Sequence, residues 1–171
     1  MTTRYVRGQK VVDFVYAAFN RKPTPPYVGI GTEIDGEIVN GVVLNVWTGN
    51  DAHVTLAGKK FSKGFLAVVG HYAYQSLGCI RLTAITEQVS IVRYAERLGG
   101  EVEGLLRNHF GPGRDAIVIG ILKEDWERRF GRLESNVPPL YDLDEVERTI
   151  GQRTKIPGPQ RNRSRARCNE P

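Results

Sequence analysis

The sequence is poor in cysteine and histidine, and this limits the kinds of site that it can build. Its 171 residues include two cysteines and three histidines. Cys79 and Cys168 lie in a predicted strand and in the C-terminal tail, so they indicate neither a disulfide framework nor a thiolate metal site. His53, His71 and His109 lack the spacing of zinc ligands, and we therefore expect no metal site.

Long apolar stretches are also missing. No run approaches the ~20 apolar residues that a membrane-spanning helix requires. The N-terminal segment, MTTRYVRGQKVVDF, lacks the charged-then-apolar layout of a secretion signal. Hydrophobic residues make up 40% of the chain and charged residues 25%, as in an ordinary globular protein. These features predict a cytoplasmic protein with one domain-sized core and no membrane contact.

The net charge of +5 comes from one end of the chain. Residues 151–171 carry six basic residues and one acidic residue, whereas residues 1–150 carry eighteen of each kind. The tail holds three prolines and almost no apolar side chains, so burial cannot offset the entropic cost of ordering it. We expect a solvated, disordered tail, and a contact with nucleic acid is the alternative.

Hydrophobic periodicity divides the first 130 residues into helices and strands. Helices are expected at residues 7–19, 66–77, 87–98 and 124–130, and strands at 27–34, 37–47, 53–58, 79–86, 101–107 and 115–123. Asp35-Gly36 is a hairpin turn signal between the first two strands. The order mixes an antiparallel meander with strand–helix–strand crossovers. It predicts an α/β (α+β) fold with a central mixed β-sheet flanked by helices.

Three regions are expected along the chain. Residues 1–130 form the folded domain. Residues 131–150 form an extension with a short amphipathic helix at 143–150, capped by Asp142. Residues 151–171 form the basic tail.

The most specific pattern runs from Gly78 to Arg107. It reads LGCIRLTAIT, TEQVSIVRYAERLGG and EVEGLLR, which is a strand, a helix ending at a Gly-Gly pair, and a strand. With GHYAYQS before it and DAIVIGILKEDW after it, this pattern resembles the GNAT superfamily of N-acyltransferases, closest in wording to the branch that acetylates ribosomal proteins. The resemblance covers roughly residues 27–126. It implies a GNAT-like domain that transfers an acetyl group directly from acetyl-CoA to an amine on a protein or small molecule.

The resemblance also implies where coenzyme A binds. In the family, a basic residue or glutamine followed by Gly-x-Gly or Gly-x-Ala precedes a helix, whose N-terminal amides bind the pyrophosphate. Here the segment from Gly58 to Phe65 keeps one glycine near the helix start and adds three lysines. The implied cofactor-binding residues are Lys60, Phe61, Ser62, Lys63, Gly64 and Phe65, with Gln88 at a position where the family has asparagine. The alternative is a basic surface loop that opens a core helix.

Four residues are candidates for the reaction itself. His53 is the expected base, because an imidazole titrates near neutrality and its strand faces the thioester in the family. A polar residue at a strand edge is the alternative. Glu87 is a weaker candidate for the base. Asn45 and Trp47 are expected to share one facing and to line an acceptor pocket, although ordinary sheet packing explains them equally well.

The acid that protonates the leaving thiolate stays unassigned. Many family members supply a tyrosine from the helix at this point, and Ala95 occupies that position here. Tyr94 is its neighbour, but it should point about 100° away around the helix.

These departures keep a second function open, namely a catalytically inactive GNAT-fold protein with a binding or structural role. Some phage-encoded proteins are similar to this chain in having a shortened N-terminal half and an incomplete cofactor loop. That similarity implies a virion or host-interaction role. Binding of acetyl-CoA distinguishes the two functions.

Overall fold

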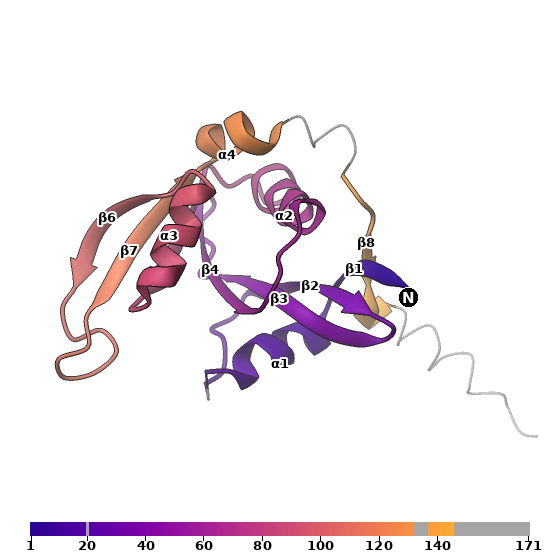
Figure 1. Cartoon of the computed structure of the whole chain (residues 1–171), viewed down its shortest axis with the longest axis horizontal. Helices are drawn as coiled ribbons and strands as arrows, with labels where there is room; N and C mark the ends of the chain where they lie inside the picture. The colour runs from indigo at the N-terminus through magenta and orange to yellow at the C-terminus, as the bar shows by residue number, and fades with distance from the viewer. Residues whose placement is uncertain (20, 132–136, 146–171) are drawn as a thin grey trace, which may run out of the picture.

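The computed structural model describes residues 1–19, 21–131 and 137–145 (Figure 1). The described strands form one eight-stranded mixed sheet in the order β6-β7-β5-β4-β3-β2-β1-β8. The strands are β1 (Thr3–Arg7), β2 (Tyr27–Ile34), β3 (Glu37–Asn45), β4 (Asp51–Gly58), β5 (Arg81–Thr86), β6 (Glu101–Leu106), β7 (Ala116–Leu122) and β8 (Leu140–Asp142). The helices are α1 (Gln9–Ala17), α2 (Lys63–Gly70), α3 (Val89–Arg97) and α4 (Lys123–Phe130), with a π-helical turn, η1 (His71–Ser76), after α2. This confirms the predicted fold class.

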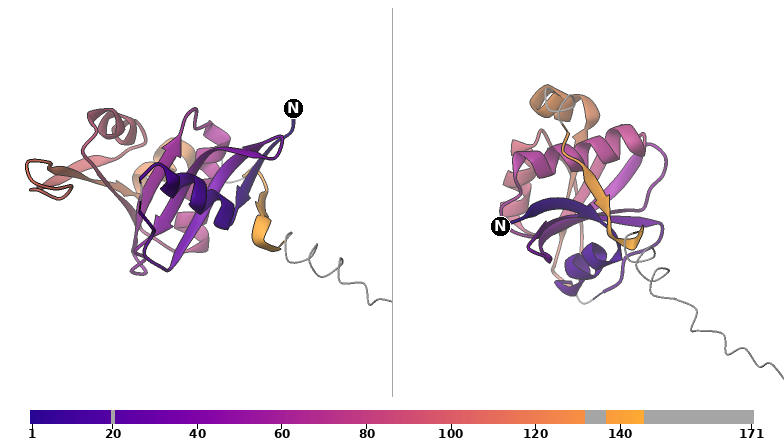
Figure 2. Two further views of the ribbon diagram at one scale, coloured as in Figure 1. Left: turned by 90° about the horizontal axis from the view of Figure 1, so that it is seen from below. Right: turned by 90° about the vertical axis from the view of Figure 1, so that its right-hand side faces the viewer.

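The helices divide between the two faces of the sheet (Figure 2). On one face α1 buries Val11, Val12 and Val15 against Val6 and Val43. On the other face α2, α3 and α4 cover a larger core. Within the described residues, no helix is both long and apolar enough to cross a membrane.

The predicted hairpin turn between β2 and β3 is confirmed. Asp35 and Gly36 both have positive φ, at 49° and 91°, which is the backbone that a two-residue turn between twisted strands requires. Strands β1 to β4 then pair in sequence order as an antiparallel meander. The meander places the end of β3 and the start of β4 side by side.

The start of the chain differs from the prediction. The helix expected at residues 7–19 is shorter, and Thr3–Arg7 forms a strand in front of it. Only Val6 of this strand is buried, so its sequence carries almost no hydrophobic alternation. The segment forms a strand because it pairs with β2 along its whole length, which the local sequence pattern does not indicate.

Residues 140–145 pack onto the sheet. Leu140–Asp142 forms β8, parallel to β1, which the sequence did not predict. The Asp142 carboxylate accepts a hydrogen bond from the Glu145 amide at 3.1 Å, as a helix cap would. The remainder of the helix expected at 143–150, and the whole basic tail, lie outside the described residues.

The contact between Arg7 and Asp142 fastens β8 to β1, at 2.8 Å between Nη2 and Oδ2. Burial opposes the charged form of Asp142, but hydrogen bonds from the Glu145 and Asp144 amides and from Arg7 outweigh it and hold its pKa below the usual range. A depressed pKa adds stability above the unfolded value of about 3.9, and this stability is lost as the pH falls through the folded pKa.

We therefore expect Asp142→Asn to destabilise the protein at pH 7 by roughly 0.5–1 kcal/mol, as for a partly exposed ion pair. Urea unfolding at pH 7 and pH 3 measures the effect. The difference from wild type should shrink at pH 3, which lies below the unfolded pKa, and disappear once the pH has fallen through the folded pKa. The exposed Glu96→Gln variant is the matched control. An equal loss at both pH values would mean that ionisation of Asp142 contributes nothing.

Candidate active site

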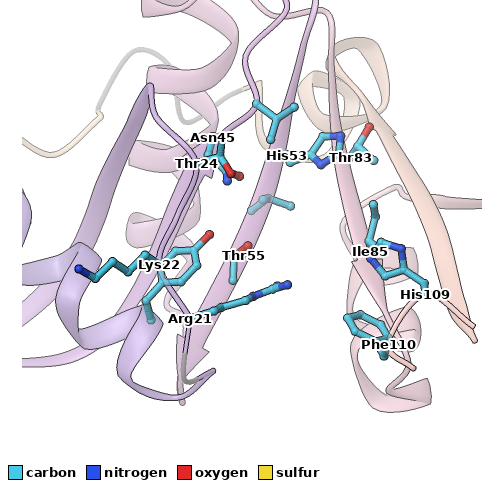
Figure 3. A pocket seen from close by; sticks show the side chains of 13 residues that line it. Arg21, Lys22, Thr24, Asn45, His53, Thr55, Thr83, Ile85, His109 and Phe110 are labelled. Atoms are coloured by element: carbon cyan, nitrogen blue, oxygen red, sulfur yellow. The ribbon is translucent and has the colours of Figure 1, made fainter. Parts of the chain in front are cut away.

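Strands β4 and β5 run side by side over four residue pairs and then separate. Asp51–Val54 pairs in parallel with Arg81–Ala84. Beyond this point β4 still pairs with β3 up to Gly58, and β5 pairs with β7 up to Thr86. The inner edges of the two strands therefore lack a strand partner over their last residues, which leaves backbone N–H and C=O groups free to pair with an extended ligand. We call this opening the fork (Figure 3).

A cavity of about 230 Å³ lies at the fork on the α1 face of the sheet. Asn45, His53 and Thr83 are register partners on β3, β4 and β5. Register partners carry their side chains on the same face, so these three polar groups form a row across the cavity. Thr55 and Ile85 continue along the two separating strands (Figure 3).

The structure places the two predicted base candidates differently. His53 is half-buried and lines the cavity next to the point where the strands part. Glu87 is exposed and is not among the cavity-lining residues. It accepts a hydrogen bond from Arg114 Nε at 3.0 Å, and this contact lowers its pKa. A carboxylate held by an arginine is a weak base, so the geometry favours His53.

Asn45 and Trp47 do not share a facing, which corrects the prediction. Asn45 is buried and lines the cavity, whereas Trp47 is 48% exposed and does not. The strand ends at Asn45, and Val46 has a φ of 49°. A left-handed residue breaks the two-residue alternation on which the prediction depended.

A polar network that the sequence analysis missed lies next to the cavity. Thr83 donates a hydrogen bond to Asp51 Oδ2 at 2.7 Å. Arg81 donates to Thr83 at 3.1 Å and pairs with Glu103 at 2.7 Å. The alternation of Asp51 and His53 along one strand was the available signal, because residues two apart point to the same face.

The opposite face of the fork is filled by aromatic side chains. Between β4, β5, α2 and α3 only about 50 Å³ of space remains, with apolar walls. Phe61 occupies this region, with ring centroids 5.6 Å from Phe65 and 6.0 Å from Tyr94. The cavities on the two faces share Val54, so the fork lies between them.

Tyr94 faces this second cavity together with Ala95, contrary to the expectation that it points elsewhere. Because α3 packs over a wide surface, residues 100° apart on the helix both reach the interior. The Tyr94 hydroxyl is buried and has no hydrogen-bond partner within the described structure. Burial raises its pKa, which keeps the hydroxyl protonated.

The predicted phosphate loop leads into α2, and its residues divide between surface and core. Ser62 caps the helix by accepting a hydrogen bond from the Phe65 amide at 3.1 Å, and its hydroxyl contacts the Tyr5 hydroxyl at 2.9 Å. One amide at the helix start is thus engaged by the loop itself. Phe65 is fully buried, and a side chain at Gly64 would meet the Tyr5 hydroxyl at 2.6 Å.

The two lysines of the loop and Gln88 lie on the surface, whereas Phe61 packs into the second cavity. Lys60 and Lys63 are exposed, so they can offer charge to an anion. Gln88 is exposed in front of α3, and its backbone N–H donates a hydrogen bond to the Thr86 hydroxyl at 3.0 Å. In the part of the chain that the structure describes, no group of three or more His, Cys, Asp or Glu side chains is placed to hold a metal ion.

Comparison with known proteins identifies the fold. No protein-family model matches the sequence, and no curated protein is detectably similar to it. Solved structures do match. The dodecameric spermidine N-acetyltransferase of Vibrio cholerae aligns with a TM-score of 0.61 and 15% identity over 74% of this chain and 97% of its own.

Two further structures agree with this match. Mutant forms of the spermidine/spermine N-acetyltransferase SpeG from Vibrio cholerae give a TM-score of 0.60 and 15% identity, over 75% of this chain and 99% of theirs. A protein of T. thermophilus that is classed as an acetyltransferase gives a TM-score of 0.53 and 21% identity, over 67% of this chain and 68% of its own. The chain therefore has the GNAT acetyltransferase fold.

Proposed function

We propose that this protein is an acetyl-CoA-dependent N-acyltransferase that acts by direct transfer to an amine. The observation that supports this function is the fork between β4 and β5, with His53 beside it on the face that carries the larger polar cavity. An amine that enters from the α1 face reaches His53 directly. The free strand edges offer hydrogen bonds to the amide groups of a pantetheine arm that enters from the α2 and α3 face.

His53 then acts as the base. When bound, acetyl-CoA supplies an acyl group activated as a thioester. His53 accepts the proton of the attacking amine, either directly or through one water molecule. A backbone N–H on the free edge of β4 stabilises the negative charge that develops on the carbonyl oxygen.

Tyr94 is the proposed acid. The carbon–nitrogen bond forms as the carbon–sulfur bond breaks, and the leaving thiolate needs a proton. The Tyr94 hydroxyl is protonated, has no partner in the described structure and faces the cavity on the cofactor side. It therefore has a proton available on the side from which the thiol leaves.

The phosphate groups are proposed to lie on the loop from Lys60 to Phe65, near Gln88. The exposed lysines and the start of α2 favour an anion there. The amide of Phe65 is already engaged by Ser62, so the lysines would carry a larger share of the interaction. Phe61 must leave its present position for a pantetheine arm to reach the fork, because about 50 Å³ cannot hold one.

The filled cavity supports a second candidate, an inactive GNAT-fold binding or structural protein. If Phe61 never moves, the fork is closed on its cofactor side. The two candidates differ in whether acetyl-CoA binds. Substitution of Phe61 tests this difference.

We expect Phe61→Ala to bind acetyl-CoA about tenfold more tightly than wild type, since the variant need not expose a half-buried aromatic ring to open the cavity. Isothermal titration calorimetry on both proteins measures this. Phe14→Ala, which removes a half-buried ring on the α1 face, is the control and should match wild type. If neither wild type nor Phe61→Ala binds acetyl-CoA, the inactive candidate replaces the transferase.

A further inference from the structure

Two basic side chains border the cavity on the α1 face, Arg21 and Lys22, from the segment after α1. His53 and His109 also line it. None of the described residues that line it is aspartate or glutamate. Figure 3 shows the Arg21 side chain extending toward the opening between β4 and β5.

Two carboxylates that neighbour cavity-lining residues, in the structure or in the chain, already have partners. Asp51 accepts from Thr83 at 2.7 Å and lies 3.5 Å from Arg81 Nε. Glu87 is held by Arg114 at 3.0 Å. An arginine therefore offsets part of the charge of each carboxylate, whereas Arg21 and Lys22 line the cavity itself.

A second hollow, of about 660 Å³, continues from this cavity along α1. The two hollows share Tyr16, Arg21 and Lys22, so the two basic residues lie at the junction between the hollows. The second hollow has one carboxylate among its described lining residues, Asp13, which accepts a hydrogen bond from Gln9 Nε2 at 2.8 Å.

Arg21 and Lys22 have no charged partner in the structure. Within the described residues neither forms an ion pair, and the Arg21 guanidinium lies over the ring of Phe19, 5.8 Å from its centroid. Both are exposed where the two hollows meet, so an acceptor that approaches His53 from the second hollow passes them. A bound anion would supply the missing partner.

We propose, on the basis of the transferase function above, that the acceptor is an amine whose molecule also carries an anionic group, a carboxylate or a phosphate. Arg21 and Lys22 bind that group while the amine lies at His53. Like charges repel, so a polyamine such as spermidine is disfavoured at this rim. The same cations favour the neutral form of the incoming amine, which is the form that attacks a thioester.

The test compares three amines of different charge: O-phosphoethanolamine, the dipeptide Ala-Asp and spermidine. Binding to the full chain is measured by calorimetry, and acetylation is measured separately with acetyl-CoA. We expect the two anionic amines to bind at least about tenfold more tightly than spermidine, and high salt to weaken their binding. Preference for one of them identifies phosphate or carboxylate as the recognised group.

Charge reversal locates the site. Arg21→Glu and Lys22→Glu should each weaken binding of the anionic amines roughly tenfold. Arg93→Glu, a reversal on the exposed face of α3, should not. If the anionic amines bind and the two charge reversals weaken that binding, the inference is supported even when no acetylation is seen. In that case only the transferase function fails. Stronger binding of spermidine, or no effect of either reversal, overturns the inference even if the protein is an active transferase.

Discussion

Replacement of His53 by alanine is expected to reduce turnover by roughly 10²–10⁴-fold, the usual contribution of a general base. The affinity for acetyl-CoA should change little, because His53 lies on the α1 face whereas the cofactor is proposed to enter from the other face. His53 is half-buried, in register with Asn45 and Thr83, next to the last pairs of β4 with β5. An imidazole at this point can reach the amine of an acceptor in the cavity.

The measurement is steady-state acetylation of an accepted amine, with acetyl-CoA affinity from calorimetry. His71→Ala is the matched control, since this histidine is exposed on η1 and does not line the cavity. Thermal unfolding of His53→Ala shows whether the strand still folds. Full turnover in a folded His53→Ala protein would rule out this base and leave water or Glu87.

Replacement of Trp126 by alanine is expected to destabilise the protein by about 3–5 kcal/mol, as for other large-to-small changes at buried aromatic residues. Trp126 is 6% exposed and packs on Tyr74 and Phe130, with ring centroids 5.9 and 4.6 Å away. Gly70, at the end of α2, leaves the room that the indole occupies, and any side chain there would overlap it. Trp126 thus holds α4 against α2.

Urea unfolding followed by circular dichroism measures this loss. Trp126→Phe keeps most of the ring and should lose much less, while Gly70→Ala should destabilise the protein by steric overlap with the indole. Exposed Tyr141→Ala is the control for loss of an aromatic ring at the surface. If Trp126→Ala costs less than about 1 kcal/mol, the contact between α4 and α2 contributes little to folding.

Local pattern in the sequence determined most of the regular structure. The β-rich composition of β2 to β4 and the Asp35-Gly36 turn specify the meander, because a two-residue turn joins neighbouring antiparallel strands. Helical spacing specifies α1 and α2. The same local rules place His53 in a strand, whereas its position facing the thioester was implied only by the family resemblance. These features depend on residues that are near one another in the chain.

Tertiary structure decided the features that depend on residues far apart. Strands β1 and β8 have little pattern of their own and form because they pair with each other and, in the case of β1, with β2. The fork follows from the place where β5, which pairs with β7 along its whole length, stops pairing with β4.

The site itself depends on such contacts. Phe61 fills the cavity on the α2 and α3 face because α3 brings Tyr94 next to it. Trp47 does not line the cavity with Asn45, because the left-handed residue Val46 stands between them. Arg21 and Lys22 reach the cavity because α1 packs on the face of the sheet that carries His53 and the segment after α1 stays on that face. Spacing in the chain carries no information about such approaches, since they are set by how helices and strands pack.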